Sequence, residues 1–80
     1  MKIRMKEWLT ERELIILQNL PDWGFKETGW RTFEIAELLG VSNSAALRLL
    51  KRLEEKNYVR KIVAGRGYRW FRTKKAWDVV

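Results

Sequence analysis

The sequence predicts a mainly α-helical domain with a small β-hairpin, an α+β fold in which three helices precede two strands. In three segments the apolar residues recur at helical spacing, each after a residue that can cap a helix. Two later segments, residues 58–64 and 68–73, are rich in β-branched and aromatic residues and enclose Gly65-Arg66-Gly67, which is typical of a hairpin. Eighty residues suffice for one small domain, which we assign to residues 1–80.

The first helix is expected to follow Thr10. This residue can cap the helix, and Glu13 can return the bond in a capping box. The helix should stop at Pro21, because proline cannot continue the hydrogen-bond ladder. Residues 14–17 are apolar around most of the helix, so we expect this helix either to lie deep or to meet another subunit.

A long connection and a second helix follow. Residues 21–31 exceed the usual length of a link between helices, and Trp30-Arg31 could form a short strand. The second helix is expected over residues 33–39, with Thr32 as its cap. Gly40 fits the left-handed position that closes a helix.

The third helix, residues 43–56, should present two opposite faces. Ser42 is its expected cap. At about 100° per residue, the apolar face consists of Ala46, Leu49, Leu50 and Leu53, and the opposite face of Ser44, Arg48 and Lys51, with Leu47 and Arg52 on the flanks. Residues 38–53 contain no acid, although a solvated basic face normally carries salt-bridge partners. The pattern favours a binding surface over a merely soluble one.

Excess positive charge is confined to the second half of the chain. Residues 1–40 have six Lys and Arg against seven Asp and Glu, whereas residues 41–80 have eleven against three. Charge of one sign collected on one stretch indicates a polyanionic partner. Release of counterions from phosphates would then provide affinity that does not depend on base sequence.

Residues 32–59 read TFEIAELLGVSNSAALRLLKRLEEKNYV. Ala36 is small where two helices would cross, and Gly40-Val41-Ser42 combines a tight turn, a buried residue and a cap. This segment resembles the helix-turn-helix core of winged-helix transcription factors, the MarR-like and ArsR-like regulators among them. The resemblance implies a winged helix-turn-helix fold, three helices plus a wing, that binds double-stranded DNA.

In helix-turn-helix proteins the start of the second motif helix enters the major groove. The residues expected nearest to base edges are Asn43, Ser44, Leu47 and Arg48. Arg48 could pair with guanine. Lys51 and Arg52 lie further along the helix, where phosphate contacts are expected.

The hairpin is the second expected contact. Its tip, residues 65–67, could bring Arg66 to the minor groove, and Arg69 adds to the basic wing. A plain turn with a soluble tip is the alternative. Tyr68 and Trp70 alternate with Arg69 and Phe71, so one aromatic set is expected to pack on the helices. Stacking of exposed aromatics on single-stranded bases stays open.

Several classes of function are excluded or disfavoured. Cysteine and histidine are both absent, so no disulfide is possible and the usual zinc ligands are missing; we expect no metal and no cofactor. We expect no enzyme either, because no nucleophile–base pair is present, and Glu34, Glu37, Glu54 and Glu55 are interpreted as solubilising charge. No apolar run approaches the length of a membrane span, and we expect no signal peptide, because the first residues alternate charged and apolar side chains. A cytoplasmic protein is expected.

The sequence therefore predicts a sequence-specific transcriptional regulator, with its third helix in the major groove and its wing at the minor groove. We expect a homodimer that uses the first helix, Trp8 and the tail around Trp77, because five tryptophans cannot all be buried in so small a core. In the alternative the tail packs on its own chain. MarR-like and ArsR-like proteins generally carry further dimer helices, for which this chain has little room.

Two other functions stay open. The first is a winged-helix protein–protein interaction module that uses the aromatic loop 21–31 as its docking surface. The second, a reader of left-handed DNA, is more remote, because such domains use a wing supported by proline and this hairpin has none.

Overall fold

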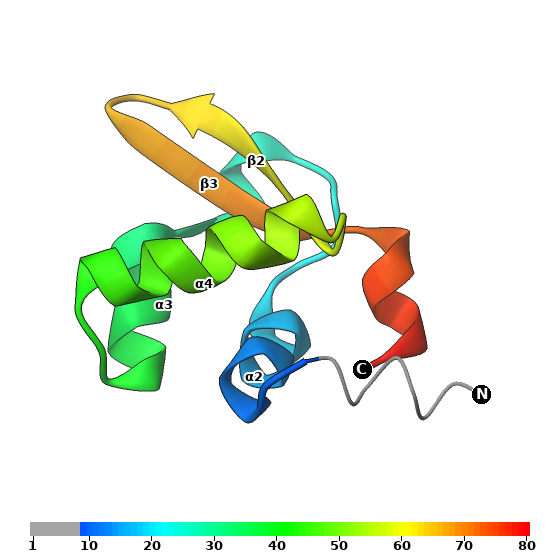
Figure 1. The fold of residues 1–80 in the computed structure, drawn as a ribbon. Helices are drawn as coiled ribbons and strands as arrows, with labels where there is room; N and C mark the ends of the chain where they lie inside the picture. The colour runs from blue at the N-terminus through cyan, green and yellow to red at the C-terminus, as the bar shows by residue number, and fades with distance from the viewer. Residues whose placement is uncertain (1–8) are drawn as a thin grey trace.

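The structure, a computed structural model, describes residues 9–80 (Figure 1). Its elements are α2 (Glu11–Asn19), a 3-10 helix (Lys26–Thr28), β1 (Trp30–Arg31), α3 (Thr32–Leu39), α4 (Asn43–Glu55), β2 (Val59–Ala64), β3 (Gly67–Arg72) and a second 3-10 helix (Lys74–Asp78). Both the predicted fold class and the predicted order of helices and strands are confirmed. The short helix in the tail is a structural finding that the sequence reading missed.

Helix α2 begins with the predicted capping box. The Thr10 hydroxyl accepts from the Glu13 backbone N–H at 3.2 Å, and Glu13 Oε1 accepts from the Thr10 N–H at 2.9 Å. Ile16 and Leu17 are fully buried, while Leu14 and Ile15 are half-buried. The helix therefore lies deep along one side and keeps a partly exposed apolar flank.

Helix α3 is capped one residue earlier than predicted. Glu34 Oε1 accepts from the Arg31 backbone N–H at 2.7 Å, which makes Arg31 the N-cap and Thr32 the first helical residue. The prediction that Thr32 is the cap is wrong, because its hydroxyl accepts instead from the Trp70 indole N–H at 3.0 Å. Gly40 closes the helix with a φ of 70°, as expected.

The three strands form an antiparallel sheet in the order β1-β3-β2. In the hairpin Ala64 pairs with Gly67, which leaves Gly65 and Arg66 as a two-residue turn. Gly65 has a φ of 68°, a conformation open to glycine at no steric cost. This β2–β3 hairpin extends away from the helices and is called the wing below (Figure 1).

Strand β3 is buried on both faces. Trp70 and Phe71 are consecutive, so they point to opposite faces, and both are fully buried. Trp70 joins the core formed with the helices. Phe71 is covered by the loop: its ring lies 5.2 Å from that of Trp23, and a Cβ on Gly29 would come within 2.7 Å of it. Trp70 therefore belongs to the aromatic set that packs on the helices, whereas loop 21–29 covers Phe71 on the opposite face.

The tail packs on its own domain. Ala76 and Val79 are buried and belong to the main core cluster.

Asn57, at a φ of 69°, follows the end of α4 and turns the chain into the wing. Across residues 9–80, no helix has the length and apolar character that a membrane crossing requires.

We expect Glu13→Ala to lower the free energy of unfolding by about 1 kcal/mol or more. The Glu13 side chain is fully buried and supplies half of the capping box, which alanine cannot replace. Glu13→Gln keeps an acceptor for the Thr10 N–H and should retain more stability. Urea unfolding measures this, with Glu11→Ala as the exposed control in the same turn. Equal stability of the Glu11 and Glu13 alanine variants would contradict the assignment.

Candidate nucleic-acid interface

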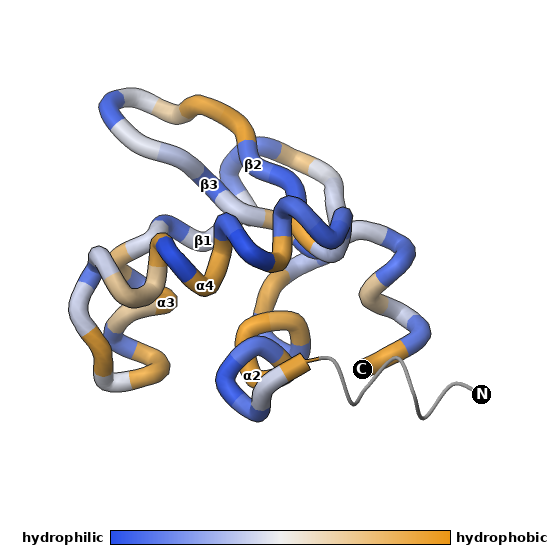
Figure 2. Tube along the Cα trace, viewed as in Figure 1, coloured by the Kyte–Doolittle hydropathy of each residue, from blue (hydrophilic) through white to orange (hydrophobic). Residues whose placement is uncertain are grey.

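One face of α4 is buried, and the opposite face must therefore point away from the core. The Ser42 hydroxyl caps the helix by accepting from the Ala45 N–H at 3.1 Å. Ala46, Leu50 and Leu53 are fully buried against α2, α3 and the sheet. Figure 2 shows hydrophobic and hydrophilic residues alternating along this helix. The apolar face predicted from the sequence is therefore confirmed.

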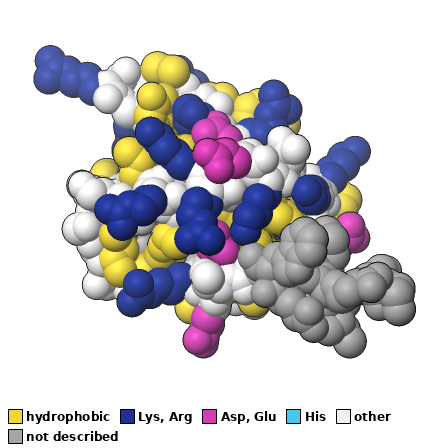
Figure 3. Space-filling model, viewed as in Figure 1, with side chains coloured by type: hydrophobic (Ala, Val, Ile, Leu, Met, Phe, Trp, Pro, Cys, Tyr) yellow, Lys and Arg dark blue, Asp and Glu magenta, His cyan; other side chains and the backbone are white. Residues whose placement is uncertain are grey.

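The opposite face of α4 is open to solvent. The exposed residues are Asn43, Ser44, Arg48, Lys51 and Arg52, while Leu47 is half-buried against the core. In the space-filling view, Lys and Arg side chains form a band over α4 (Figure 3). Within residues 9–80, neither Arg48 nor Lys51 forms an ion pair. The term "basic face" denotes Ser44, Arg48 and Lys51 from here on.

Arg52 differs from the other cations of α4. Its Nε lies 3.8 Å from Glu13 Oε2, an oxygen that is buried and has no hydrogen-bond partner. This contact joins α2 to α4, and the Arg52 side chain remains 55% exposed. Its predicted role, holding a phosphate, stays a prediction.

Two glutamates read from the sequence as solubilising charge have specific partners. Glu54 accepts from Lys61 Nζ through both carboxylate oxygens, at 3.0 and 2.8 Å, and so ties α4 to β2. Glu34 caps α3. The interpretation of these two residues as solubilising charge alone is wrong, because Glu54 bonds to a lysine on another element and Glu34 bonds to the backbone N–H three residues before it.

The wing carries two of the predicted contact residues, Arg66 and Arg69. Arg66 is exposed at the turn. Arg69 is half-buried, and its Nη1 donates to the carbonyls of Gly29 at 2.8 Å and Glu27 at 3.4 Å. Arg69 therefore anchors the loop to the wing, a role that the sequence did not reveal. Its contact with DNA stays a prediction.

Arg31 is a residue that the sequence analysis missed. Its Nη1 donates to the Ala64 carbonyl at 3.0 Å, next to the wing turn. With Asn43 and Tyr68 it also lines a groove of about 180 Å³ between the start of α4 and the wing. The feature that points to Arg31 is its pairing with Arg69 across β1 and β3. This pairing is known only once the strand register is known.

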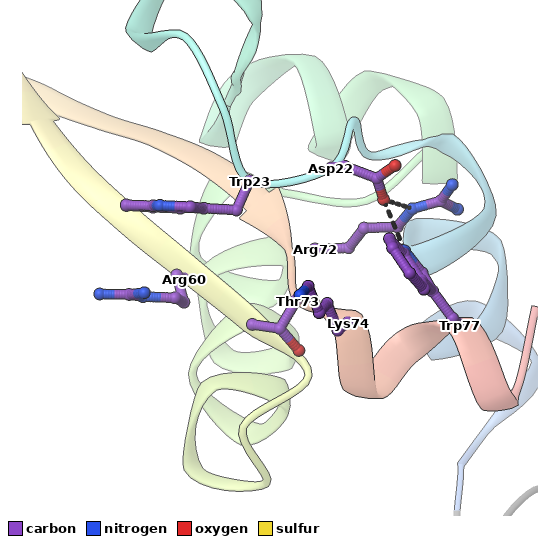
Figure 4. Close-up of a pocket in the computed structure, with 7 residues that line it drawn as sticks. All are labelled: Asp22, Trp23, Arg60, Arg72, Thr73, Lys74 and Trp77. Carbon is purple, nitrogen blue, oxygen red and sulfur yellow. Dashed lines mark hydrogen bonds and ion pairs between the residues drawn. The ribbon is translucent and has the colours of Figure 1, made fainter.

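A larger pocket, of about 410 Å³, lies between the loop, the base of the wing and the tail (Figure 4). Asp22 Oδ1 accepts from Trp77 Nε1 at 2.9 Å and from Arg72 Nε at 2.8 Å. Both bonds hold the pKa of Asp22 below its ordinary value, and the bond from Trp77 has the larger effect. The Arg60 guanidinium stacks on the Trp23 ring at 4.2 Å. Aromatic rings and cations thus surround a single carboxylate.

The same pocket bears on the predicted subunit contact. Trp77 is 53% exposed and bonds to Asp22 of its own chain, so the alternative in which the tail packs on its own domain describes the structure. Trp8, the other expected contact, lies outside the described residues. Among residues 9–80, no three His, Cys, Asp or Glu side chains gather as a metal site would require.

The fold and the basic face define a winged-helix protein of the helix-turn-helix class. The sequence model of the MarR family matches residues 9–62. The chain belongs to the MarR family. Among curated proteins, no sequence relative matches it.

Solved structures share this fold. The transcriptional regulator Tm0710 from Thermotoga maritima is 31% identical with a TM-score of 0.77, and the match covers 98% of this chain and 53% of that one. The transcriptional regulator SlyA is 28% identical with a TM-score of 0.72, over 98% and 55%. ZitR from Lactococcus lactis, solved in complex with DNA, is 30% identical with a TM-score of 0.69, over 85% and 45%. The chain therefore spans about half the length of these relatives.

We expect Arg48→Ala and Lys51→Ala to affect DNA binding differently. Loss of a bidentate base contact at Arg48 should cost about 1–3 kcal/mol on the preferred duplex and relax the sequence preference. Loss of a phosphate contact at Lys51 should weaken all duplexes alike. Competition binding with preferred and scrambled duplexes measures both, and Arg12→Ala, an exposed cation on α2, is the control. Unchanged binding in both variants would reject the basic face as the interface.

We expect the tail to remain docked from neutral pH down to the ordinary Asp22 pKa of 3.8. Because folding lowers this pKa, the ionised carboxylate stabilises the docked tail above 3.8, and this contribution is lost as the pH falls through the lower, folded value. Acid titration of tryptophan fluorescence, with circular dichroism as a check on global unfolding, measures the step. Asp22→Ala should show a loosened Trp77 already at pH 7. A wild-type step well above pH 4 would contradict this.

Proposed function

We propose that this chain binds double-stranded DNA as a transcriptional regulator, with α4 in the major groove and the wing turn at the minor groove. One observation carries the proposal. The outward side of α4 holds an exposed basic face that no acidic side chain neutralises within residues 9–80, while the buried side fixes its direction. A long helix with this polarity suits insertion into a groove lined by phosphates.

The positions of the side chains support different contacts with the DNA. Asn43, Ser44 and Arg48 lie in the first half of α4 and are exposed, so they can reach base edges. Lys51 and Arg52 follow one turn later and suit phosphates. Arg66, exposed at the end of the wing, suits the narrow minor groove. Leu47 is half-buried and can offer its exposed part to a thymine methyl group.

Family membership supports the same function. ZitR, 30% identical, was solved with DNA, and Tm0710 and SlyA are described as transcriptional regulators. Since this chain spans about half of each, a role for the whole protein remains a proposal. The absence of a nucleophile–base pair from the sequence supports a binding protein over an enzyme.

A homodimer in the cytoplasm completes the proposal. Leu14 and Ile15 leave an apolar flank on α2, and Trp77 and Val80 expose about half of their surface on the tail. A second copy could cover this surface, and two copies would suit a two-fold symmetric DNA site.

Protein docking through loop 21–31 is the second candidate. Phe25 is 81% exposed and Trp23 is 42% exposed, although the loop is anchored at both ends. Exposed aromatic residues on an ordered loop are a common feature of docking surfaces. The basic face of α4 lies outside this loop and would have no role in such docking, so DNA binding is the better-supported function.

We expect low-micromolar or tighter binding of duplex DNA that weakens steeply between about 50 and 200 mM salt, because bound cations release counterions from phosphates. Fluorescence anisotropy with a random duplex measures the salt slope, and selection from a random pool finds the preferred site. Phe25→Ser is the control for the loop and should bind normally. Absent or salt-insensitive binding would overturn the proposal, and sedimentation with and without DNA decides the stoichiometry.

A further inference from the structure

One arginine joins the wing to the helix-turn-helix frame. Arg31, at the junction of β1 and α3, donates from Nη1 to the Ala64 carbonyl at 3.0 Å. Its guanidinium also lies along the turn, since a Cβ on Gly67 would be 3.4 Å from Nη1 and one on Gly65 would be 3.9 Å from Nη2. The Arg31 guanidinium thus bonds to the backbone at Ala64, 33 residues away in sequence, and lies beside the glycines on both sides of Arg66.

The surroundings leave this guanidinium few other partners. Arg31 lies directly opposite Arg69 in the sheet, and like charges in that position repel. Arg69 turns to the carbonyls of the loop, whereas Arg31 turns to the wing. Glu34, the nearest acid in sequence, is bonded to the Arg31 backbone N–H. Within the described part of the chain, Arg31 forms no ion pair.

Arg31 also lies near the start of α4. The groove of about 180 Å³ that it lines is closed on one side by Asn43, the first residue of α4, and on the other by Gly67 and Tyr68 of the wing. The bond to Ala64 therefore holds the guanidinium between the wing turn and the start of α4. These two elements are the ones expected to occupy neighbouring grooves of the duplex.

We propose that Arg31 is a positioning residue that fixes the wing turn relative to α4, so that Arg66 and the basic face engage one duplex together. This inference rests on the proposed function. A wing that is fixed in the free protein loses little conformational freedom on binding, whereas a loose wing must be ordered at a cost in affinity. Arg31 thus acts through Arg66 rather than as another cation on the DNA.

The wing itself does not require Arg31 in order to form. Strands β2 and β3 pair over six residues each, and Trp70 and Phe71 anchor β3 on both faces. Arg31 is half-exposed, and its removal opens no cavity in the core. The variant Arg31→Ala is therefore expected to fold, with a thermal midpoint close to that of the wild type.

A double-mutant cycle tests the inference. Duplex affinity is measured by anisotropy for the wild type, Arg31→Ala, Arg66→Ala and the double variant. Arg31→Ala should weaken binding roughly fivefold to tenfold in the wild-type background and much less when Arg66 is already absent, because coupled residues are not additive. Arg31→Lys keeps the charge but lacks the planar guanidinium and should not restore affinity. Additive losses, or full rescue by lysine, would instead identify a simple electrostatic contact and overturn the inference.

A second measurement needs no DNA. Backbone NMR order parameters for residues 65–67 should fall in Arg31→Ala and stay at the wild-type value in Arg12→Ala, a variant that loses a cation far from the wing, while those of α4 stay high in both. An unchanged turn would overturn the inference. If the wild type fails to bind duplex DNA, the proposed function fails, and the order parameters still decide whether Arg31 positions the wing.

Discussion

The interface depends on the burial of one side of α4. Ala46, Leu50 and Leu53 lose all contact with solvent against α2, α3 and the sheet, and a helix has only one opposite side. Arg48 and Lys51 are therefore exposed whatever the loops do. The same apolar core holds Trp70, so the base of the wing and α4 share one support. Fold stability and the geometry of the interface have a common origin here.

Local chemistry made much of this arrangement predictable. The capping box of Thr10 and Glu13, the left-handed Gly40 and the cap at Ser42 each depend on residues within one turn of each other, and the structure confirms all three. The two faces of α4 follow from helical spacing alone. Features determined by near neighbours in sequence are the ones that pattern reading can recover.

Long-range partners were not predictable in the same way. Thr32 looked like a cap, but its hydroxyl bonds to Trp70, 38 residues away. Glu54 was interpreted as solubilising charge, Arg69 was expected to contact DNA and Arg31 was given no role, yet each bonds to a group on another element. Nothing in their local spacing distinguishes them from solvated residues, because the strand register that brings the partners together is a property of the whole fold.

The shared carboxylate of Asp22 has a mechanical consequence. A single oxygen accepts from Arg72, at the base of the wing, and from Trp77, in the tail. Without the tail, this oxygen would keep only the Arg72 donor. The tail and the base of the hairpin therefore share one acceptor, and both contacts depend on the ionised carboxylate of this one residue.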